Sequence, residues 1–517
     1  MKNDQQTGYH LSMQNSQNKP FKGIICGDKR VTYSEMEDRA RSLANALFTK
    51  GLKPGDCVAI HLPNCLPFVE VIHACQQAGF WFTCLHKNLK PSELSYILED
   101  AGAKAIITHQ ALGEMAFSKT LQKNLLAQIA IGEKNGFLDY EKLLEESPKN
   151  PIKPSKEGGR MYYTSGTTGR PKGIRKKTNP QDDEKIRQKR WPAVYKKDHS
   201  VNLAAGPLYH AAPLKFDLFL PLKHRATMVI MEKFDPLTFL KLVEEHKVTH
   251  CHMVATMFQR LLSLPEKTRV SYNISSLEQI LHGAAPTPVP VKKAMIDWVG
   301  PILFEYYGGS EGGGSDITSL EWLKKPGSVG RPWHKRKIVI LDKNGQKQPA
   351  FKVGAVYFDA LGEKTFEYYN APEKTQKAYH GHLFTLGDYG YLDQDGYLFL
   401  TGRSAEVIIA GGVNIYPAEI DKVLDTMEGI TDAAAIGVPN KEYGEEVKVI
   451  AVAAKEMAPS SQLEKSILDY CRKHLASYKC PRSVEFVTSL PRNEAGKLLR
   501  RELRKPYWQK EQQTHHP

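Results

Sequence analysis

The sequence has few cysteines, and their spacing does not suggest a metal site. Eight cysteines occur in 517 residues, without a Cys-x-x-Cys pair. Most stand beside apolar residues, as Cys75 and Cys84 do. This pattern is typical of buried, reduced thiols and argues against a structural zinc site.

Long apolar runs are also missing. The first 20 residues are polar and hold no apolar segment like that of a secretory signal, and no later run is long enough to cross a bilayer. We therefore expect a cytoplasmic protein without a transmembrane segment. The hydrophobic content of 41% is ordinary for a folded protein. A chain of 517 residues is too long for one core, which predicts at least two domains.

Acidic residues are too few to balance the basic ones. The 71 Lys and Arg exceed the 57 Asp and Glu by 14, and a basic surface attracts polyphosphates. No RRM, KH, zinc-finger or helix-turn-helix signature accompanies this charge. We therefore expect anionic small molecules as partners and no nucleic acid, and we keep a basic nucleic-acid-binding protein as the non-enzyme alternative.

Helices and strands alternate through most of the chain. An N-cap at Thr32 or Ser34 opens an amphipathic pattern that Gly51 ends, and the apolar run from Cys57 to Leu62 follows as a strand. The same order of helix and strand recurs farther along. This alternation predicts parallel sheets covered by helices, and so an α/β body.

The pattern changes toward the C-terminus to short β segments and turns. Asp395-Gly396 between two apolar runs predicts a β-hairpin, and a compact α+β pattern follows. We place the domain boundary near Gly402-Arg403, which gives domains over 1–402 and 403–517. A polar, flexible tail is expected over 506–517.

The most unusual stretch is "TSGTTGRPKG", residues 164–173, which places four hydroxyl side chains, three glycines and two cations together. Glycines let backbone N–H groups turn toward an anion, hydroxyls donate hydrogen bonds, and Arg170 and Lys172 add charge. The spacing is too short for a Walker A loop, and Pro171 keeps Arg170 out of helical geometry. The stretch predicts a phosphate loop of another kind, suited to β- and γ-phosphates.

Together with the segments that follow it, this loop resembles that of the adenylate-forming superfamily, which includes acyl-CoA synthetases, luciferases and peptide-synthetase adenylation domains. The matching segments are, in order, "YYTSGTTGRPKGI", "PLYHAAP", "LHGAAP", "EYYGGSEGGG", "LFTLGDYGYLDQDGYLFLTGRSAEVIIAGGVNIYPAEI" and "LPRNEAGKLLRREL". They cover nearly the whole chain from about Val31. The resemblance implies a large N-terminal α/β domain with parallel-type sheets and a small β-barrel, a small mobile C-terminal α+β domain, and an active site between them.

The resemblance also implies a two-step ligase reaction. ATP and a carboxylic acid give an acyl-AMP and pyrophosphate, and the thiol of coenzyme A then displaces AMP. A carboxylate needs this activation because oxide is a poor leaving group, and joining two anions requires cations and N–H donors aimed at the α-phosphate. The expected cofactors are ATP, Mg²⁺ and coenzyme A. The expected partners are these molecules and a small-molecule carboxylic acid, with a homodimer as a further expectation.

The resemblance assigns roles to individual residues. Lys497 would reach the carboxylate and the α-phosphate, Glu311 would hold Mg²⁺, and Tyr307 would stack on adenine. Asp388 and Arg403 would contact the ribose. With Lys497 and Glu311, the expected catalytic residues are Thr164, Lys172 and His210. Other expected nucleotide- or CoA-binding residues are Thr164, Ser165, Gly166, Thr167, Thr168, Gly169, Lys172, Gly283, Ala284, Ala285, Glu305, Tyr306, Gly308, Ser310, Gly411, Gly412 and Asn414.

The second step needs a different surface. In this family the C-terminal domain rotates after adenylation, which removes the lysine and presents the glycine loop that matches "AGGVN" to a pantetheine tunnel. Gly411 and Gly412 would let the thiol arm pass close to the backbone. His210 resembles the gate between the acyl pocket and the thiol channel.

The sequence departs from the family pattern at two positions. Ala405 stands at the usual hinge position and the acid follows one place later at Glu406, so the residue that turns stays open between Ser404 and Glu406. Arg225 stands where a glycine is common, and we expect its side chain at the surface.

The sequence says least about the acyl group. By position, its pocket would include Tyr209, His210, His252, Val254, Ala255, Gly308 and Gly309. The glycine-rich run 308–314 leaves space, which favours a medium- or long-chain fatty acid, or a bulky cyclic acid, over acetate. The alternatives are an acyl-AMP ligase that loads a carrier protein, a ligase for a cyclic, steroid or aryl acid, and a luciferase-like oxygenase. An amino-acid substrate is disfavoured because no aspartate stands directly beside His210.

Overall fold

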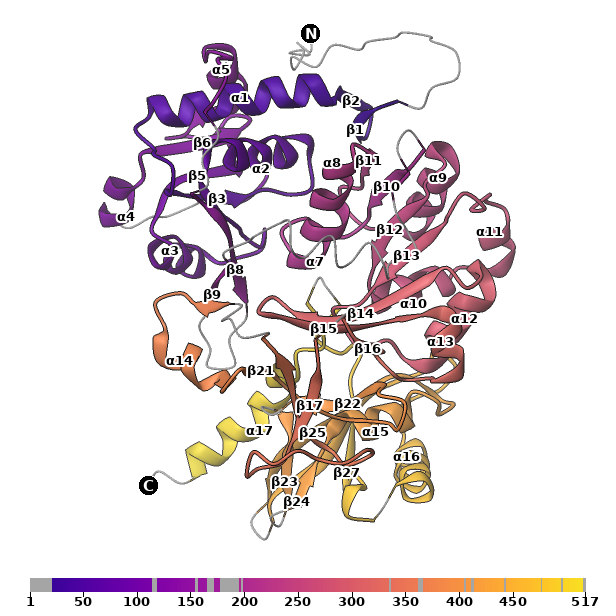
Figure 1. Ribbon diagram of the computed structural model, residues 1–517. Helices are drawn as coiled ribbons and strands as arrows, with labels where there is room; N and C mark the ends of the chain where they lie inside the picture. Colours follow the sequence, from indigo (N-terminus) through magenta and orange to yellow (C-terminus); the bar gives the residue numbers. More distant parts are fainter. Residues whose placement is uncertain are drawn as a thin grey trace.

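Four sheets organise the part of the chain that the computed structural model describes (Figure 1). The described residues are 21–113, 119–153, 157–164, 172–176, 195–196, 199–333, 336–360, 366–403, 406–410, 413–440, 443–475, 477–493 and 496–514. Two large sheets, each with a parallel centre, form most of the N-terminal unit. Of the two five-stranded sheets, the one that contains β23 to β27 forms the C-terminal unit with its helices. The predicted α/β fold is confirmed.

The first large sheet has eight strands in the order β19-β9-β8-β4-β3-β5-β6-β7, parallel from β8 to β7. Its strands are β3 (Cys57–His61), β4 (Trp81–Cys84), β5 (Ala103–His109), β6 (Ala127–Ile131), β7 (Leu138–Asp139), β8 (Gly159–Thr164), β9 (Lys172–Lys176) and β19 (Glu367–Tyr368). The helices of this part are α1 (Tyr33–Thr49), α2 (Leu66–Ala78), α3 (Pro91–Asp100), α4 (Lys119–Asn124) and α5 (Tyr140–Glu145).

The second large sheet has nine strands in the order β16-β15-β14-β13-β12-β10-β11-β1-β2, parallel from β14 to β1. Its strands are β1 (Gly23–Cys26), β2 (Lys29–Thr32), β10 (Val201–Ala204), β11 (Thr227–Ile230), β12 (His250–Met253), β13 (Gln279–His282), β14 (Leu303–Gly309), β15 (Gly312–Thr318) and β16 (Arg331–Pro332). Its helices are α7 (Ala211–Pro213), the π-helix η1 (Leu214–Phe219), α8 (Leu220–His224), α9 (Pro236–His246), α10 (Ala255–Leu262), α11 (Glu266–Val270), α12 (Val289–Val299) and α13 (Ser319–Lys324).

Two smaller sheets complete the fold. The predicted small β-barrel corresponds to a partial barrel of β17 (Ile338–Leu341), β18 (Gly354–Asp359), β20 (Tyr379–His380), β21 (Leu383–Leu392) and β22 (Leu398–Arg403), with α14 (Pro372–Lys377) beside it. The C-terminal unit holds β23 (Ile408–Ala410), β24 (Val413–Ile415), β25 (Ile430–Asn440), β26 (Gly444–Ala453), β27 (Ser483–Phe486), α15 (Pro417–Leu424), α16 (Ser461–His474), the 3₁₀ helix η3 (Ser477–Lys479) and α17 (Arg500–Thr514). The exact domain boundary near Gly402-Arg403 stays a prediction.

Local signals explain where several of these elements begin and end. Thr32 caps α1 and forms a capping box with Glu35, and Gly51 follows the helix at φ +95°. Asp395-Gly396 lies at the turn of the β21–β22 hairpin, where Gly396 has φ +78°. These three predictions are confirmed.

The predicted flexible tail over 506–517 is wrong for its first part. Helix α17 continues to Thr514, although Pro506 lies inside it. The Tyr507 hydroxyl donates a hydrogen bond to Glu485, and Trp508 Nε1 donates one to the Gly437 carbonyl at 3.2 Å. These two aromatic side chains hold the helix on the C-terminal sheet, a tertiary contact that the polar sequence of the tail does not reveal.

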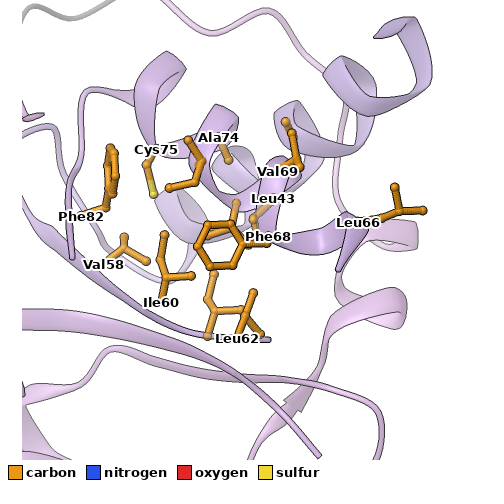
Figure 2. Packing of buried hydrophobic residues seen from close by; sticks show 14 of the residues in the cluster. Leu43, Val58, Ile60, Leu62, Leu66, Phe68, Val69, Ala74, Cys75 and Phe82 are labelled. Atoms are coloured by element: carbon orange, nitrogen blue, oxygen red, sulfur yellow. The ribbon is translucent and has the colours of Figure 1, made fainter. Parts of the chain in front are cut away.

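The largest core lies where α2 packs on β3. Helix α2 is buried on most sides, and nine of its 13 residues are apolar. In Figure 2, Phe68 of α2 lies close to Ile60 of β3 and to Leu62 just beyond that strand. The one carboxylate of this helix, Glu70, accepts hydrogen bonds from Arg39 Nε and from the Tyr140 hydroxyl, both at 2.7 Å. This buried group ties α2 to α1 and α5.

The cysteines agree with the expectation from composition. All eight cysteines are free thiols, five of them buried, as predicted. Burial raises the pKa of the Cys57 thiol to about 12, so it stays protonated. Within the described residues, none of the helices combines the length and the apolar character needed to span a membrane.

A buried ion pair crosses from α12 to β14. Lys292 Nζ lies 2.5 Å from Glu305 Oε2, and its ammonium group also lies 4.7 Å from the centre of the Trp322 ring. The Lys292 side chain is 0% exposed. Glu305, predicted to bind the nucleotide, therefore has a structural partner inside the core.

We predict that Lys292→Met lowers the free energy of unfolding by about 3–5 kcal/mol, because it leaves the Glu305 carboxylate buried without its cation. The double variant Lys292→Met/Glu305→Leu should be more stable than the single variant, since it removes both charges. Equilibrium urea unfolding of the three proteins measures this. A double variant less stable than the single one would show that Glu305 is held by other groups.

Asp217 of η1 is a second buried polar group. Its side chain is 0% exposed. Oδ1 accepts hydrogen bonds from the His252 backbone N–H at 3.1 Å and from Asn202 Nδ2 at 3.3 Å, whereas Oδ2 has no hydrogen-bond partner. Burial raises the pKa of Asp217 well above its usual range.

We predict that Asp217→Asn makes the protein more stable relative to wild type as the pH rises. The pKa of Asp217 is higher in the folded than in the unfolded state, so its stabilising contribution is complete below the unfolded pKa and is lost as the pH rises toward the folded value. Asparagine cannot ionise. Unfolding free energies at pH 4, 6 and 8 test this; a difference between the proteins that does not change with pH would contradict it.

Candidate active site

The carboxyl ends of three parallel strands define the candidate site. Met253 of β12 pairs with His282 of β13, and His282 pairs with Glu305 of β14, so the segments that follow these strands begin at the same edge of the sheet. Ligands in open α/β sheets bind at this edge. The sequence motifs "LHGAAP" and "EYYGGSEGGG" both lie there.

The "LHGAAP" segment follows β13 and approaches β14 closely. A Cβ atom at Gly283 would lie 2.4 Å from the Tyr306 carbonyl oxygen, so only glycine fits. Ala284 has φ +66°, a left-handed conformation that non-glycine residues seldom adopt. Ala285 follows in the same bend. This tight turn therefore packs its backbone directly against the backbone of β14.

Tyr307 and Asp388, predicted to bind adenine and ribose, contact each other. The Tyr307 hydroxyl donates a hydrogen bond to Asp388 Oδ2 at 2.5 Å. Asp388 on β21 in turn pairs through its backbone with Arg403 on β22. The structure therefore brings Tyr307 together with Asp388, 81 positions later, and so with the β21–β22 hairpin that also carries Arg403, as a nucleoside site would require.

Glu311, the predicted Mg²⁺ ligand, lies in the turn between β14 and β15. Its Oε1 accepts a hydrogen bond from the Tyr368 hydroxyl at 2.9 Å. Tyr368 lies on β19, which pairs with β9, the strand that leaves the phosphate loop. Sequence reasoning missed Tyr368, whose only signal is its place in the aromatic run "FEYYN".

The phosphate loop itself is described only at its two ends. Thr164 at the end of β8 pairs through its backbone with Lys172 at the start of β9. Ser165, Gly166, Thr167, Thr168 and Gly169 lie outside the described residues. The Lys172 end of the loop begins β9, which lies between β8 and β19, and so stands on the strand next to Tyr368, the partner of Glu311.

The loop that carries Lys497 lies against the N-terminal unit. Asn493 and Lys497 exchange two hydrogen bonds, from Asn493 N to the Lys497 carbonyl and from Lys497 N to Asn493 Oδ1. A Cβ atom at Gly496 would lie 2.7 Å from Thr256 Oγ1 on α10. Because α10 follows β12 directly, Lys497 stands near the carboxyl ends of the strands.

Of the residues predicted to line the thiol path in the C-terminal domain, only Asn414 is described. Gly411 and Gly412 fall outside the described residues, and Asn414 lies on β24, where its backbone pairs with Ile409. Glu406, next to the usual hinge position, accepts a hydrogen bond from Arg500 Nε at 3.2 Å. This contact joins Glu406 to the start of α17.

His210, the predicted gate, caps α7 beside two other aromatic side chains. Its ring centre lies 5.7 Å from that of His86 and 5.0 Å from that of Tyr209. Burial, with the charge of His86 as a second cause, lowers the pKa of His210 to about 4. The ring is therefore neutral near pH 7.

The predicted acyl pocket holds an aromatic cluster on one face of β12 and β14. His252 Nε2 lies 3.0 Å from the Tyr306 hydroxyl, and the Phe216 ring of η1 stacks on His252 at 5.7 Å. Val254 and Ala255 follow β12 and are buried. Gly308 and Gly309 end β14, and Ser310 lies in the turn before Glu311.

Arg225 has a left-handed backbone conformation, which explains why related proteins commonly have glycine at this position. Its φ is +49°, a left-handed value at the C-cap of α8. The side chain is 55% exposed, as expected, and its Nη1 lies 2.7 Å from Glu37 Oε1.

Comparisons with known proteins agree with this geometry. Residues 12–369 match the family described as AMP-binding enzyme, and residues 419–497 match the AMP-binding enzyme C-terminal domain. A long-chain-fatty-acid–CoA ligase of Bacillus subtilis is 31% identical over 94% of this chain and 91% of its own length. A feruloyl-CoA synthase of an Amycolatopsis species is 31% identical over 93% of this chain and 95% of its own.

A solved structure shares the fold. The o-succinylbenzoate CoA synthetase of Bacillus subtilis, in complex with its acyl-adenylate intermediate, is 27% identical, with a TM-score of 0.79 over 94% of this chain and 95% of that protein. The predicted enzyme class, an AMP-forming acid–thiol ligase that uses ATP, Mg²⁺ and coenzyme A, is confirmed at the level of the family and its relatives. The chain belongs to the AMP-binding enzyme family, within the adenylate-forming superfamily that its motifs resemble.

Proposed function

We propose that this chain joins an organic carboxylic acid to coenzyme A through an acyl-AMP, with the residues named above in the roles that the sequence predicts. The observation that supports this most is the convergence of three separate segments at one sheet edge. Tyr307 contacts Asp388, Glu311 lies between β14 and β15, and the Lys497 loop packs on Thr256.

In the first step the nucleoside would lie against Tyr307, with the ribose hydroxyls bound by Asp388. A carboxylate suits a vicinal diol because each of its oxygens can accept one hydrogen bond. The Lys497 ammonium group would then offset the negative charge of the acid and of the α-phosphate as they approach. The packing of Gly496 on Thr256 supports this assignment, because it holds the Lys497 loop on the N-terminal unit.

The carboxylate of Glu311 is a suitable ligand for a magnesium ion. A carboxylate is a hard oxygen ligand, and the Tyr368 hydroxyl fixes the orientation of this one. When bound, Mg²⁺ supplies positive charge that shields the phosphates of ATP. Tyr368 would therefore hold the ligand in place from the strand next to the phosphate loop.

In the second step His210 would separate the acyl pocket from the thiol channel. Because its pKa is lowered to about 4, its ring carries no charge at neutral pH. A neutral ring can turn aside at lower cost than a charged one, since less solvation is lost. Coenzyme A is the acceptor we propose; a carrier protein is the alternative.

The acid itself is part of the proposal. The sequence favours a medium- or long-chain fatty acid, and one relative is named for such a substrate. The described pocket residues favour the second candidate, a ring-bearing acid, because Phe216, His252 and Tyr306 fill the face of the sheet beside Gly308 with rings. We propose the ring-bearing acid.

We predict that Lys497→Ala lowers the rate of acyl-AMP formation at least ~100-fold, as expected for a group that acts in the transition state. Coenzyme A transfer from supplied acyl-AMP should stay within about threefold. Pyrophosphate release and thioester formation measure the two steps separately. Lys505→Ala, an exposed position on α17, is the control; equal loss of both steps in Lys497→Ala would refute the role.

We also predict that Tyr368→Phe raises the Mg²⁺ concentration needed for half-maximal ATP binding about fivefold, the effect of one hydrogen bond. Calorimetric titration of ATP into the enzyme at several Mg²⁺ concentrations measures this without turnover. Tyr443→Phe, on the C-terminal unit, removes a hydroxyl elsewhere. Unchanged Mg²⁺ dependence in Tyr368→Phe would show that Glu311 does not act through Tyr368.

A further inference from the structure

Arg492 joins the loop that carries Lys497 to the C-terminal sheet. Its Nη2 donates hydrogen bonds to Asp432 Oδ1 at 2.9 Å and to Oδ2 at 3.0 Å, and its Nε lies 3.3 Å from Oδ2. Its Nη1 donates a hydrogen bond to the Gly496 carbonyl oxygen at 3.1 Å. One guanidinium group therefore holds both a carboxylate on β25 and the backbone carbonyl that directly precedes Lys497.

The backbone of the Lys497 loop turns at the glycine that Arg492 holds. Gly496 has φ +73°, a left-handed value that favours glycine, and its N–H donates a hydrogen bond to the Asn493 carbonyl at 2.8 Å. Arg492 and Leu498 form an antiparallel bridge at the base of the turn. Because the Gly496 carbonyl belongs to the peptide bond that enters Lys497, a hydrogen bond to this oxygen fixes the direction in which Lys497 leaves the turn.

The same glycine lies against the N-terminal unit. A Cβ atom at Gly496 would lie 2.7 Å from Thr256 Oγ1 and 3.0 Å from its Cγ2, so the backbone of the turn directly contacts α10. Arg492 holds the turn from the C-terminal sheet, while Thr256 bounds it on the other side. A shift of the turn would move Lys497 relative to the strand ends, and a misplacement of about 1 Å can lower a reaction rate about 100-fold.

The ion pair of Arg492 with Asp432 has more value as an orienting contact than as a source of stability. The two side chains are 29% and 28% exposed, and ion pairs that water reaches contribute little to the free energy of unfolding. A planar guanidinium presents its donors in a fixed fork. Once Asp432 fixes one side of this fork, the remaining donor can point only at the Gly496 carbonyl.

Resting on the ligase function proposed above, we propose that Arg492, oriented by Asp432, is a positioning residue for acyl-AMP formation. Arg492 fixes the Gly496 carbonyl and thereby places Lys497 at the acid and the α-phosphate. It acts through Lys497 and contacts neither substrate. The coenzyme A step does not use Lys497, so this step does not depend on Arg492.

The first test separates the two half-reactions. Pyrophosphate release with Mg-ATP is measured for benzoate, cinnamate, octanoate and palmitate, and the acid with the highest rate in wild type is used for the variants. Arg492→Met should lower the kcat of acyl-AMP formation at least ~10-fold, with the KM for ATP within about threefold. Thioester formation from supplied acyl-AMP should also stay within about threefold. A smaller loss of kcat, or an equal loss in the thioester step, overturns the inference.

Arg504→Met is the matched control. Arg504 joins α17 to β26, where its Nη2 lies 3.2 Å from Glu445 Oε1, and the two side chains are 21% and 16% exposed. The variant removes a similarly exposed ion pair from the same unit, so both half-reactions should stay within about threefold of wild type. A loss of acyl-AMP formation as large as that in Arg492→Met would assign the effect to the stability of the unit and overturn the inference.

Asp432→Asn tests the same contact from the other side, and it serves where Arg492→Met does not fold. This variant keeps an oxygen acceptor but removes the charge that orients Arg492. The kcat of acyl-AMP formation should fall at least ~3-fold, as expected when a charge-assisted hydrogen bond becomes a neutral one. An unchanged kcat overturns the inference.

The double variant shows whether Arg492 acts through Lys497. In the Lys497→Ala background, adding Arg492→Met should lower acyl-AMP formation by less than about twofold, because no catalytic ammonium group is left to position. A merely structural role of Arg492 would lower the rate by the same factor in both backgrounds. A further loss of ~10-fold therefore overturns the inference.

Hydrogen exchange separates failure of the inference from failure of the proposed function. Mass spectrometry reads the backbone amides of Asn493, Gly496 and Lys497, which are hydrogen-bonded within the loop, without any turnover. Arg492→Met should raise their exchange rates at least ~10-fold, and Arg504→Met should not. If wild type forms no acyl-AMP with any of the four acids while exchange rises as expected, the ligase function fails and the positioning of the loop stands. Unchanged exchange in Arg492→Met overturns the inference.

Discussion

The parallel pairing of β12, β13 and β14 is the constraint on which the candidate site depends. Parallel strands share one carboxyl edge, so the chain beyond Met253, His282 and Glu305, the last residues paired across these strands, starts from the same edge. The glycine at 283 makes this arrangement tight, since any side chain there would collide with the backbone of β14. Residues expected to bind the nucleotide and residues expected to bind the acyl group are neighbours on β14, because successive side chains of a strand face opposite sides of the sheet.

Tyr306 and Tyr307 show the consequence of that alternation. Tyr306 lies with Phe216 and His252, whereas Tyr307 reaches Asp388 in the adjoining sheet. One strand therefore supplies a wall to each of two substrates, and their reacting groups can meet where the strand becomes glycine-rich. The Lys497 loop reaches the same edge from the C-terminal unit, through the packing of Gly496 on Thr256.

Buried polar groups fall into two kinds in this part of the protein. The Lys292–Glu305 pair satisfies itself and stabilises the sheet behind the site. Asp217 and His252 each keep an atom without a partner. Such atoms lower stability. The sequence marks neither kind, because a lone Asp or His in an apolar run gives no local signal of its surroundings.

The sequence by itself determined the α/β class, the capped start of α1, the hairpin at Asp395-Gly396 and the family, because these depend on local periodicity, turn chemistry and ordered motifs. Only the tertiary structure decided which distant residues meet. The contact of Glu311 with Tyr368 and the docking of Trp508 on Gly437 join residues 57 and 71 positions apart. Such contacts depend on strand order and packing between elements, and no local pattern of residues encodes either.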